Sequence, residues 1–257
     1  MKIATPISHL FTDDALAVQI LRVSDCLEQR DHSPKPDISN SELYHSDLQL
    51  IHPFQNQNID YLEKIRRDYS NLRCISFHMA SCYAQPTTKE GIFVSGKNLA
   101  TYEEMIENSQ INTDIVRRIF GKKVKVLVEN NNFYPTSAYN YIANPEFIKE
   151  VISLNDLDFL YDIAHAKISA HNMGISYDAY KSELPLEEIS QVHICKYDVN
   201  EDNLAFDAHK VPDEIEFAEV KNLSTNGKLK YLTIEYYKSG EVLINSIEKL
   251  KTYVDIS

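Results

Sequence analysis

Six short apolar runs in this chain of 257 residues each end in a histidine or a carboxylate. The clearest is Phe159-Leu160-Tyr161, which is followed by Asp162 and, three residues later, by His165. The other five runs end at His52, His78, Glu129, His193 and Glu235. Imidazole and carboxylate groups are the ligands that proteins use for iron, manganese and zinc. If the fold brings these six ends together, the sequence predicts a metal site.

The elements that must position these residues follow from the hydrophobic pattern. Strand-like apolar runs lie at residues 2–8, 26–30, 48–54, 73–80, 124–129, 157–161, 189–194 and 229–236. Helical periodicity lies at residues 13–23, 59–69, 101–120, 145–154, 177–183, 213–223 and 241–253. Strands that alternate with helices predict a parallel sheet, and eight such units predict a closed (β/α)₈ TIM barrel.

We therefore expect an α/β protein with one domain over residues 1–257, a xylose-isomerase-like TIM barrel. One unit is irregular, because no clear helix follows residues 26–30 and residues 31–40 have the composition of a loop. An open doubly wound sheet is the main competitor. No glycine-rich phosphate-binding loop supports that competitor.

In such a barrel the carboxyl ends of the strands meet on one face, where active sites lie. The loop that follows residues 189–194 adds an Asp-x-His pair to the same face. The predicted metal ligands are His52, His78, Glu129, Asp162, His165, His193, Asp207, His209 and Glu235. Nine donors exceed the needs of one ion, so we expect two or three ions that share bridging carboxylates. The donor set is too rich in nitrogen for magnesium or calcium, and it leaves iron, manganese and zinc open.

Each of these residues also has an ordinary structural interpretation. A single buried histidine is more often a hydrogen-bonded core residue than a ligand, and Asp162 is placed to cap a helix. Taken together, the structural interpretation needs a separate partner for every buried polar group. His171 has a weaker claim to the site. Cys82 and Cys195 follow strand ends, and we interpret both as packing residues.

Composition excludes other classes of function. The net charge is −12 and the acids are spread along the chain, which argues against binding to nucleic acid. No apolar stretch reaches the roughly 18 residues that a membrane span needs. The chain starts without a long apolar signal core, and its four cysteines show no Cys-x-x-Cys spacing. We expect a cytoplasmic protein with reduced thiols.

The order of these motifs resembles that of the multinuclear non-heme iron-dependent oxidative enzymes, formerly a family of unknown function, which includes the methanobactin-biosynthesis oxidase. The similarity covers most of the chain. The matching segments are Ile51-His52, Ser76-Phe77-His78-Met79, Val128-Glu129-Asn130, Tyr161-Asp162 with Asn172-Met-Gly174, Val192-His193-Ile194, Asp207-Ala-His209 with Pro212, and Ile234-Glu235-Tyr236. Each motif alone is weak, and their order and spacing together are specific.

The resemblance implies a metal-dependent oxidoreductase that uses O₂ at a centre of two or three iron ions, Fe²⁺ and Fe³⁺, with zinc or manganese as alternative metals. It implies a substrate cysteine in a ribosomally made peptide and a separate leader-binding partner protein. In such a metal centre, Glu129 is the expected bridging carboxylate. Glu129, Asp162 and His165 are the expected catalytic residues. Asn130 to Asn132, Tyr134 and Tyr197 are candidate pocket residues, with ordinary loop positions as the alternative.

This chain also departs from the family pattern. Where relatives often carry Asp-x-Asn-Asn, it has Asp162-Ile-Ala-His165, which adds an imidazole. The family's Glu-Asn pair near residues 26–30 has no clear match, although Glu28 and Arg30 lie close to it.

Two other classes of function remain open. One is a xylose-isomerase-like sugar isomerase or epimerase, or an endonuclease of the trinuclear zinc type, because the same barrel serves those chemistries. The other is a metal-storing or partner-binding barrel without activity.

Overall fold

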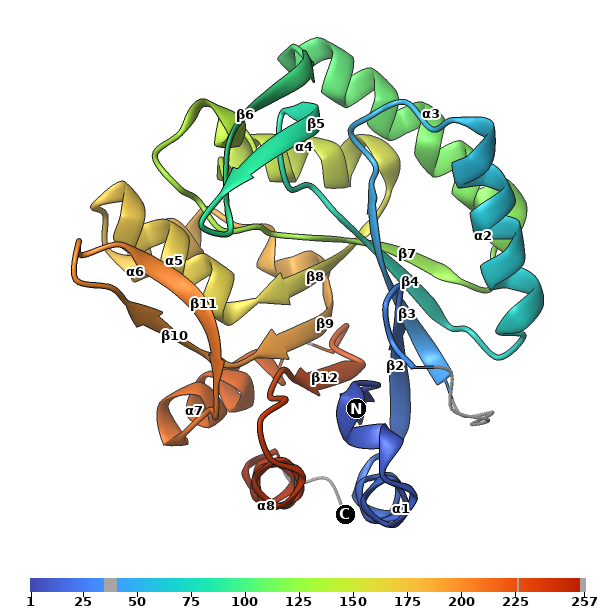
Figure 1. The fold of residues 1–257 in the computed structure, drawn as a ribbon, viewed down its shortest axis with the longest axis vertical. Helices are drawn as coiled ribbons and strands as arrows, with labels where there is room; N and C mark the ends of the chain where they lie inside the picture. The colour runs from blue at the N-terminus through green and yellow to red at the C-terminus, as the bar shows by residue number, and fades with distance from the viewer. Residues whose placement is uncertain (35–40, 226, 255–257) are drawn as a thin grey trace.

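The computed structural model describes residues 1–34, 41–225 and 227–254, and its centre is a closed barrel of eight parallel strands (Figure 1). The strands follow the order β1-β12-β9-β8-β7-β4-β3-β2 around the barrel. Their bounds are β1 Lys2–Pro6, β2 Cys26–Arg30, β3 Ser41–Gln49, β4 Cys74–His78, β7 Lys125–Glu129, β8 Asp158–Asp162, β9 Ile189–Ile194 and β12 Tyr231–Ile234. The predicted TIM barrel is confirmed.

Helices surround the strands, and α1 and α8 pack side by side near the two ends of the chain (Figure 1). The helices are α1 Asp14–Val23, α2 Asn56–Asp68, α3 Tyr102–Phe120, α4 Pro145–Asn155, α5 Ile163–Met173, α6 Tyr177–Ser182, α7 Glu214–Leu223 and α8 Gly240–Tyr253, with short 3₁₀ turns η1 His9–Thr12, η2 Ser137–Tyr139 and η3 Leu186–Glu188. Their ends follow local chemistry: Asn144 caps α4 through the backbone N–H of Glu146, and Gly121 ends α3 at a φ of 73°.

One strand boundary and one helix that the sequence did not predict, α5, matter for the site. The third barrel strand spans residues 41–49 rather than 48–54, so His45 lies in the strand and His52 lies beyond its end. Helix α5 starts directly after β8, so His165 lies in the first turn of a helix. Of the loop predicted over residues 31–40, residues 35–40 lie outside the described part of the chain.

Two hairpins extend the barrel on its carboxyl-end face, in regions where the sequence suggested loops. Strands β5 Tyr83–Lys89 and β6 Ile92–Leu99 form the first, and β10 Lys196–Val199 and β11 Ala205–Lys210 form the second. At Gly96 in β6, an added Cβ would lie 2.5 Å from the carbonyl oxygen of Gln85, so the strands approach here as only glycine permits. Most residues of these strands are half-buried or exposed, so the strands lack the hydrophobic pattern of a buried strand.

Among the described residues, we find no helix with the length and apolar character that crossing a bilayer requires.

Asn112 ties helix α3 to the chain that follows β3. Its side-chain N–H₂ donates to the carbonyl oxygens of Leu50, at 2.7 Å, and His52, at 2.6 Å. Its side-chain oxygen accepts from the N–H of Phe54 at 3.3 Å. Asn112 is 1% exposed. These backbone groups therefore take their hydrogen bonds from its side chain and not from water.

We predict that Asn112→Ala lowers the free energy of unfolding by about 2–3 kcal/mol, because it leaves buried backbone groups unpaired. Urea denaturation measures the change. Gln110→Ala on the exposed face of α3 is the control, with an expected change within about 0.5 kcal/mol. Equal effects of the two substitutions would contradict this role for Asn112.

Candidate metal centre

Glu129, at the carboxyl end of β7, is the point on which the candidate site converges. Its Oε2 atom lies 3.0 Å from Nδ1 of His78 and 3.5 Å from Nε2 of His45. Its Oε1 atom lies 3.2 Å from Nδ1 of His193 and 3.9 Å from Nδ1 of His165. The side chain is 2% exposed. One oxygen of this carboxylate therefore faces His45 and His78, and the other faces His193, an arrangement that suits a bridging ligand.

Neighbouring groups fix the orientation of His193. Its Nε2 atom lies 3.0 Å from Oε2 of Glu28, and that contact assigns the ring proton to Nε2. Glu28 is held in turn by the side-chain amide of Gln191 at 2.5 Å. The Nδ1 atom of His193 then presents a lone pair, 3.1 Å from Oε1 of Glu235. A carboxylate behind an imidazole is the usual arrangement around a metal-bound histidine.

Two more histidines are oriented in the same way. Nδ1 of His45 lies 2.7 Å from the hydroxyl of Ser76, which leaves its Nε2 facing Glu129. Nδ1 of His165 lies 2.9 Å from the carbonyl oxygen of Asn130, which leaves its Nε2 facing inward. Each ring keeps one nitrogen available for a ligand.

The two carboxylate oxygens of Asp162 have different surroundings. Oδ1 caps helix α5 by accepting from the N–H of His165 at 2.7 Å. Oδ2 is buried and has no hydrogen-bonding partner among the described residues. Burial raises the pKa of Asp162 to about 7; His165 opposes the rise and Glu235 adds to it. An orphaned carboxylate oxygen in a buried site fits a cation.

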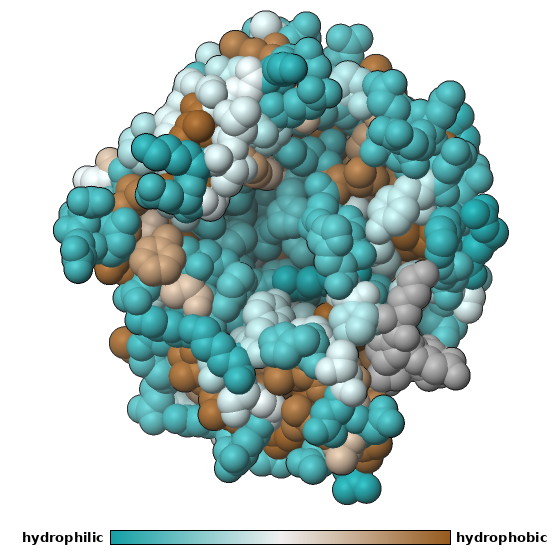
Figure 2. All heavy atoms as spheres, viewed as in Figure 1, coloured by the Kyte–Doolittle hydropathy of each residue, from teal (hydrophilic) through white to brown (hydrophobic). Residues whose placement is uncertain are grey.

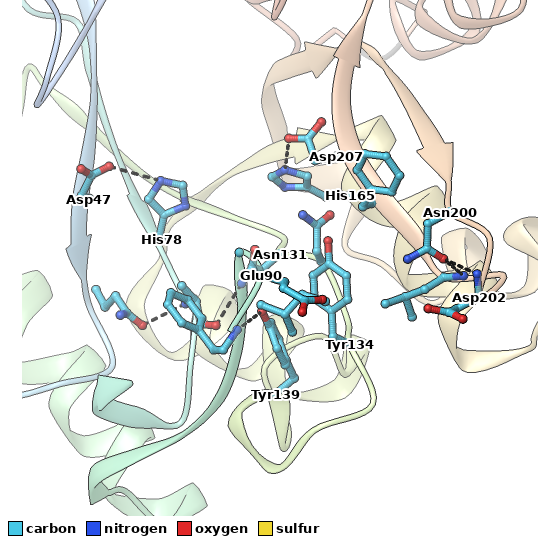
Figure 3. A pocket seen from close by; sticks show the side chains of 18 residues that line it. Asp47, His78, Glu90, Asn131, Tyr134, Tyr139, His165, Asn200, Asp202 and Asp207 are labelled. Carbon is cyan, nitrogen blue, oxygen red and sulfur yellow. Dashed lines mark hydrogen bonds and ion pairs between the residues drawn. The ribbon is translucent and has the colours of Figure 1, made fainter. Parts of the chain in front are cut away.

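Asp207 and His209 form the opposite side of the site, on β11. Nε2 of His209 lies 3.0 Å from Oδ2 of Asp207 and 3.3 Å from Oε2 of Glu235. Nε2 of His165 lies 3.6 Å from the same Asp207 oxygen (Figure 3). The Asp-x-His pair thus places both side chains at one point, with His209 at a φ of 41°.

Arg30, at the end of β2, is the guanidinium group of the cluster. It donates to Oε1 of Glu28 at 2.7 Å and pairs with Oε1 of Glu235, and it lies over the ring of Tyr237. These contacts occupy one oxygen of each carboxylate. Oε2 of Glu235 remains directed toward His209.

The site concentrates negative charge. Its carboxylates are Glu28, Glu129, Asp162, Asp207 and Glu235, and Arg30 is the one guanidinium that pairs with them in the described part of the chain. Burial lowers the pKa of His193, but Glu28 and Glu235 outweigh it and hold that pKa well above its ordinary value. The site therefore draws positive charge, as protons on imidazole or as metal ions that displace them.

The donor atoms gather into positions that suit separate ions. His45, His78 and Glu129 form one group, and Glu129, Asp162 and His193 form a second, with ligand atoms within 4.8 Å of one another in each. Cys195, Asp207 and Glu235 form a third. Buried atoms on Glu129, Asp162 and His193 face this region without a hydrogen bond among the described residues, so the residues present fit a multinuclear metal centre.

The structure brings together every predicted ligand except His52. Nε2 of His52 lies 2.8 Å from the carbonyl oxygen of Ser81, and its ring lines a separate pocket with Glu104 and Asn108. The assignment of His52 to the cluster is wrong because it rested on a strand placed several residues too late. The strand contributes His45 instead.

Sequence reasoning also missed Glu28, Arg30 and Cys195 as parts of the cluster. Glu28 and Arg30 alternate on β2, which is the signal that both face one side of a strand end. His171 lies apart, with Nε2 3.0 Å from the carbonyl oxygen of Asn203.

A pocket of about 820 Å³ opens onto the cluster between the two hairpins. His78, His165 and Asp207 lie in its wall (Figure 3). Asn131, Asn132 and Tyr134 also line it, whereas Tyr197 and Asn130 are not among its lining residues. Figure 2 shows the hollow at the centre of this face, surrounded mostly by hydrophilic residues.

Fold and site together define a xylose-isomerase-like (β/α)₈ barrel with a candidate multinuclear centre at its mouth. Similar solved structures include D-psicose 3-epimerase from Clostridium cellulolyticum H10, at a TM-score of 0.58 and 13% identity, with 99% of this chain and 98% of that chain covered. A xylose isomerase candidate from Rhodospirillum rubrum matches at a TM-score of 0.60 and 11% identity, with 100% and 99% covered. These likenesses show the fold alone.

The family follows from the sequence comparison. The model of the RiPP precursor modification enzymes MbnB/TglH/ChrH matches residues 51–224, and the chain belongs to this family. His45 and Glu235 lie outside the matched residues, yet the structure places both in the cluster.

Curated relatives match over shorter stretches. A UPF0276 protein of Paraburkholderia phytofirmans is 29% identical over 114 residues, which cover 43% of this chain and 35% of that protein. A UPF0276 protein of Acaryochloris marina is 23% identical over 155 residues, covering 60% and 54%. The chain therefore spans about a third to a half of the length of these relatives.

We predict that Glu129→Gln loses at least one bound divalent ion per chain, because the amide removes the negative charge and replaces one of the two ligand oxygens with an NH₂ group that cannot bind a cation. Metal analysis of protein purified without oxygen measures this. Glu103→Gln, on the exposed surface of α3, is the control and keeps the wild-type content. Full metal content in Glu129→Gln would exclude a bridging role.

Proposed function

We propose that this protein is a multinuclear non-heme iron-dependent oxidase that uses O₂ to modify cysteine residues of a ribosomally synthesised peptide. The observation that carries the proposal is the convergence of histidines on both oxygens of Glu129, in a member of a family of precursor-modifying enzymes. Iron, when bound, supplies sites for the cysteine thiolate and for O₂, which accepts the electrons that the cysteine loses.

The donor set supports iron over the hard divalent ions. Five imidazoles contact the carboxylates of the cluster: His45, His78, His165, His193 and His209. Imidazole with carboxylate suits iron, manganese and zinc, whereas magnesium and calcium prefer oxygen. The O₂ chemistry that the family resemblance implies needs a metal that changes oxidation state, which zinc does not do.

The proposed roles of the three catalytic residues follow from their contacts. Glu129 would serve two ion positions, since its two oxygens face different groups of ligands. Asp162 is pinned by its helix-capping oxygen, so its second oxygen points into the centre without freedom to turn. His165 joins the Glu129 side to the Asp207 side of the site.

The pocket supports a peptide substrate. Phe93 and Phe206 from the two hairpins and Tyr139 from the loop after β7 line its wall, while Glu90 and Asp202 lie at the hairpin turns. An extended peptide that crosses the mouth would place an apolar side chain on the aromatic wall and a basic one near the turns. Its cysteine would then reach His78 and Asp207 beneath.

We also propose a separate partner protein that presents the leader segment of the peptide. The family's precursor-modifying role supports it. The net charge of −12 would suit a partner or leader with basic residues.

A second candidate is a divalent-metal sugar isomerase or epimerase, favoured by the fold shared with D-psicose 3-epimerase. Against it stands the number of imidazoles, because two-ion sugar sites depend mainly on carboxylates. A trinuclear zinc endonuclease shares the barrel as well, but the acidic groups at the pocket rim would repel a phosphate backbone.

We predict two or three iron ions per chain in protein purified without oxygen, and O₂ consumption that requires iron and a cysteine-containing peptide. Iron analysis, an O₂ electrode and peptide mass spectrometry test this with the candidate precursor peptide and its partner protein. His78→Ala is expected to lower the rate by at least about tenfold, the smaller loss seen when metal-site partners are removed.

His9→Ala is the matched control, because His9 is exposed in η1 and takes part in none of the described ion pairs of the cluster, and it should keep wild-type activity. A peptide in which serine replaces cysteine should neither consume O₂ nor change mass. Stoichiometric zinc that survives growth with added iron, or epimerisation of a sugar without O₂, would overturn the proposal.

A further inference from the structure

Cys195 directly follows β9 and lies against the side of the site formed by Asp207. Its Sγ atom is 3.5 Å from Oδ1 of Asp207, and the side chain is 1% exposed. Ligand atoms of Cys195, Asp207 and Glu235 all lie within 4.8 Å of one another. The thiol therefore sits where a third ion would be held.

The surroundings of this thiol differ from those of a packing cysteine. Its Sγ atom lies beside the carboxylates of Asp207 and Glu235. By contrast, Cys74 lies in an apolar cluster with Leu43 and Leu127 at the other end of the barrel.

A second observation points to a cation beside this position. Oδ2 of Asp162 is fully buried and has no hydrogen-bonding partner in the described part of the chain. It lies 3.9 Å from Nε2 of His165, whose other inward neighbour is Asp207. Here several carboxylates and a thiol face one another with little positive charge between them. Such a group of side chains fits a bound metal ion.

We propose that Cys195 is a thiolate ligand of a third metal position, together with Asp207, His209 and Glu235. This inference rests on the proposed metal centre, but it needs neither iron nor O₂. On binding, the Sγ–H bond breaks, a metal–sulfur bond forms, and the proton passes to solvent. A sulfur donor makes this position softer than the positions around Glu129, and it favours iron, zinc or cobalt over manganese.

A role for Cys195 as a nucleophile or disulfide partner of the substrate fits the structure less well. The residue is absent from the described lining of the pocket between the hairpins. Its sulfur lies 3.5 Å from Oδ1 of Asp207, which itself lines the pocket.

The test is a titration of the metal-depleted, intact chain with Co²⁺ under anaerobic conditions. We expect a thiolate-to-cobalt charge-transfer band in the near ultraviolet, with one more proton released than in Cys195→Ser. Cys195→Ser should lose the band and weaken the last ion to bind by at least about tenfold. Cys82→Ser is the control, since its thiol donates to the carbonyl oxygen of Ser137, and it should keep the band.

If Cys195→Ser fails to fold, a band that survives in Cys26→Ser, Cys74→Ser and Cys82→Ser assigns the thiolate to Cys195 by elimination. Cobalt bound without a thiolate band, no cobalt bound at all, or a band that survives in Cys195→Ser would overturn the inference. A band that is lost in Cys195→Ser, together with no peptide oxidation by the iron-loaded protein, would sustain the thiolate ligand and refute only the proposed function.

Discussion

The carboxylates at the mouth of this barrel cannot remain uncompensated. Glu28, Glu129 and Asp162 are almost fully buried, where an unpaired charge is costly. Arg30 compensates part of this charge by pairing with Glu28 and Glu235. The remainder calls for cations among the histidines, which is why the same residues favour either protonated imidazoles or bound metal. The rest of the structure serves to hold this arrangement.

The barrel fold positions the side chains of the cluster. Parallel strands bring residues from distant parts of the sequence to one rim, so β2, β3, β4, β7, β8 and β9 each carry a side chain of the cluster, and Glu235 directly follows β12. Residues behind the rim then orient the donors: Ser76 acts on His45, and Glu28 acts on His193. The two hairpins stand above the rim and give the centre a walled pocket.

The sequence predicted the barrel well, because alternating strands and helices leave few other folds. It predicted Glu129, Asp162 and His193 in the cluster because each ends a strongly apolar run. The sequence prediction failed at β3. Tyr44-His45-Ser46 has little apolar character, so the strand was assigned to the more apolar residues that begin at 48. His52 replaced His45 for that reason. The hairpins were missed because strands that are not fully buried need no regular hydrophobic pattern, as in β5.

The central claim is that Glu129 joins two iron ions. The most direct measurement is an anomalous difference map from crystals grown without oxygen, with data on either side of the iron absorption edge. The account predicts iron peaks on both sides of the Glu129 carboxylate, one beside His45 and His78 and one beside Asp162 and His193. A single peak, or peaks that respond at the zinc edge alone, would contradict it.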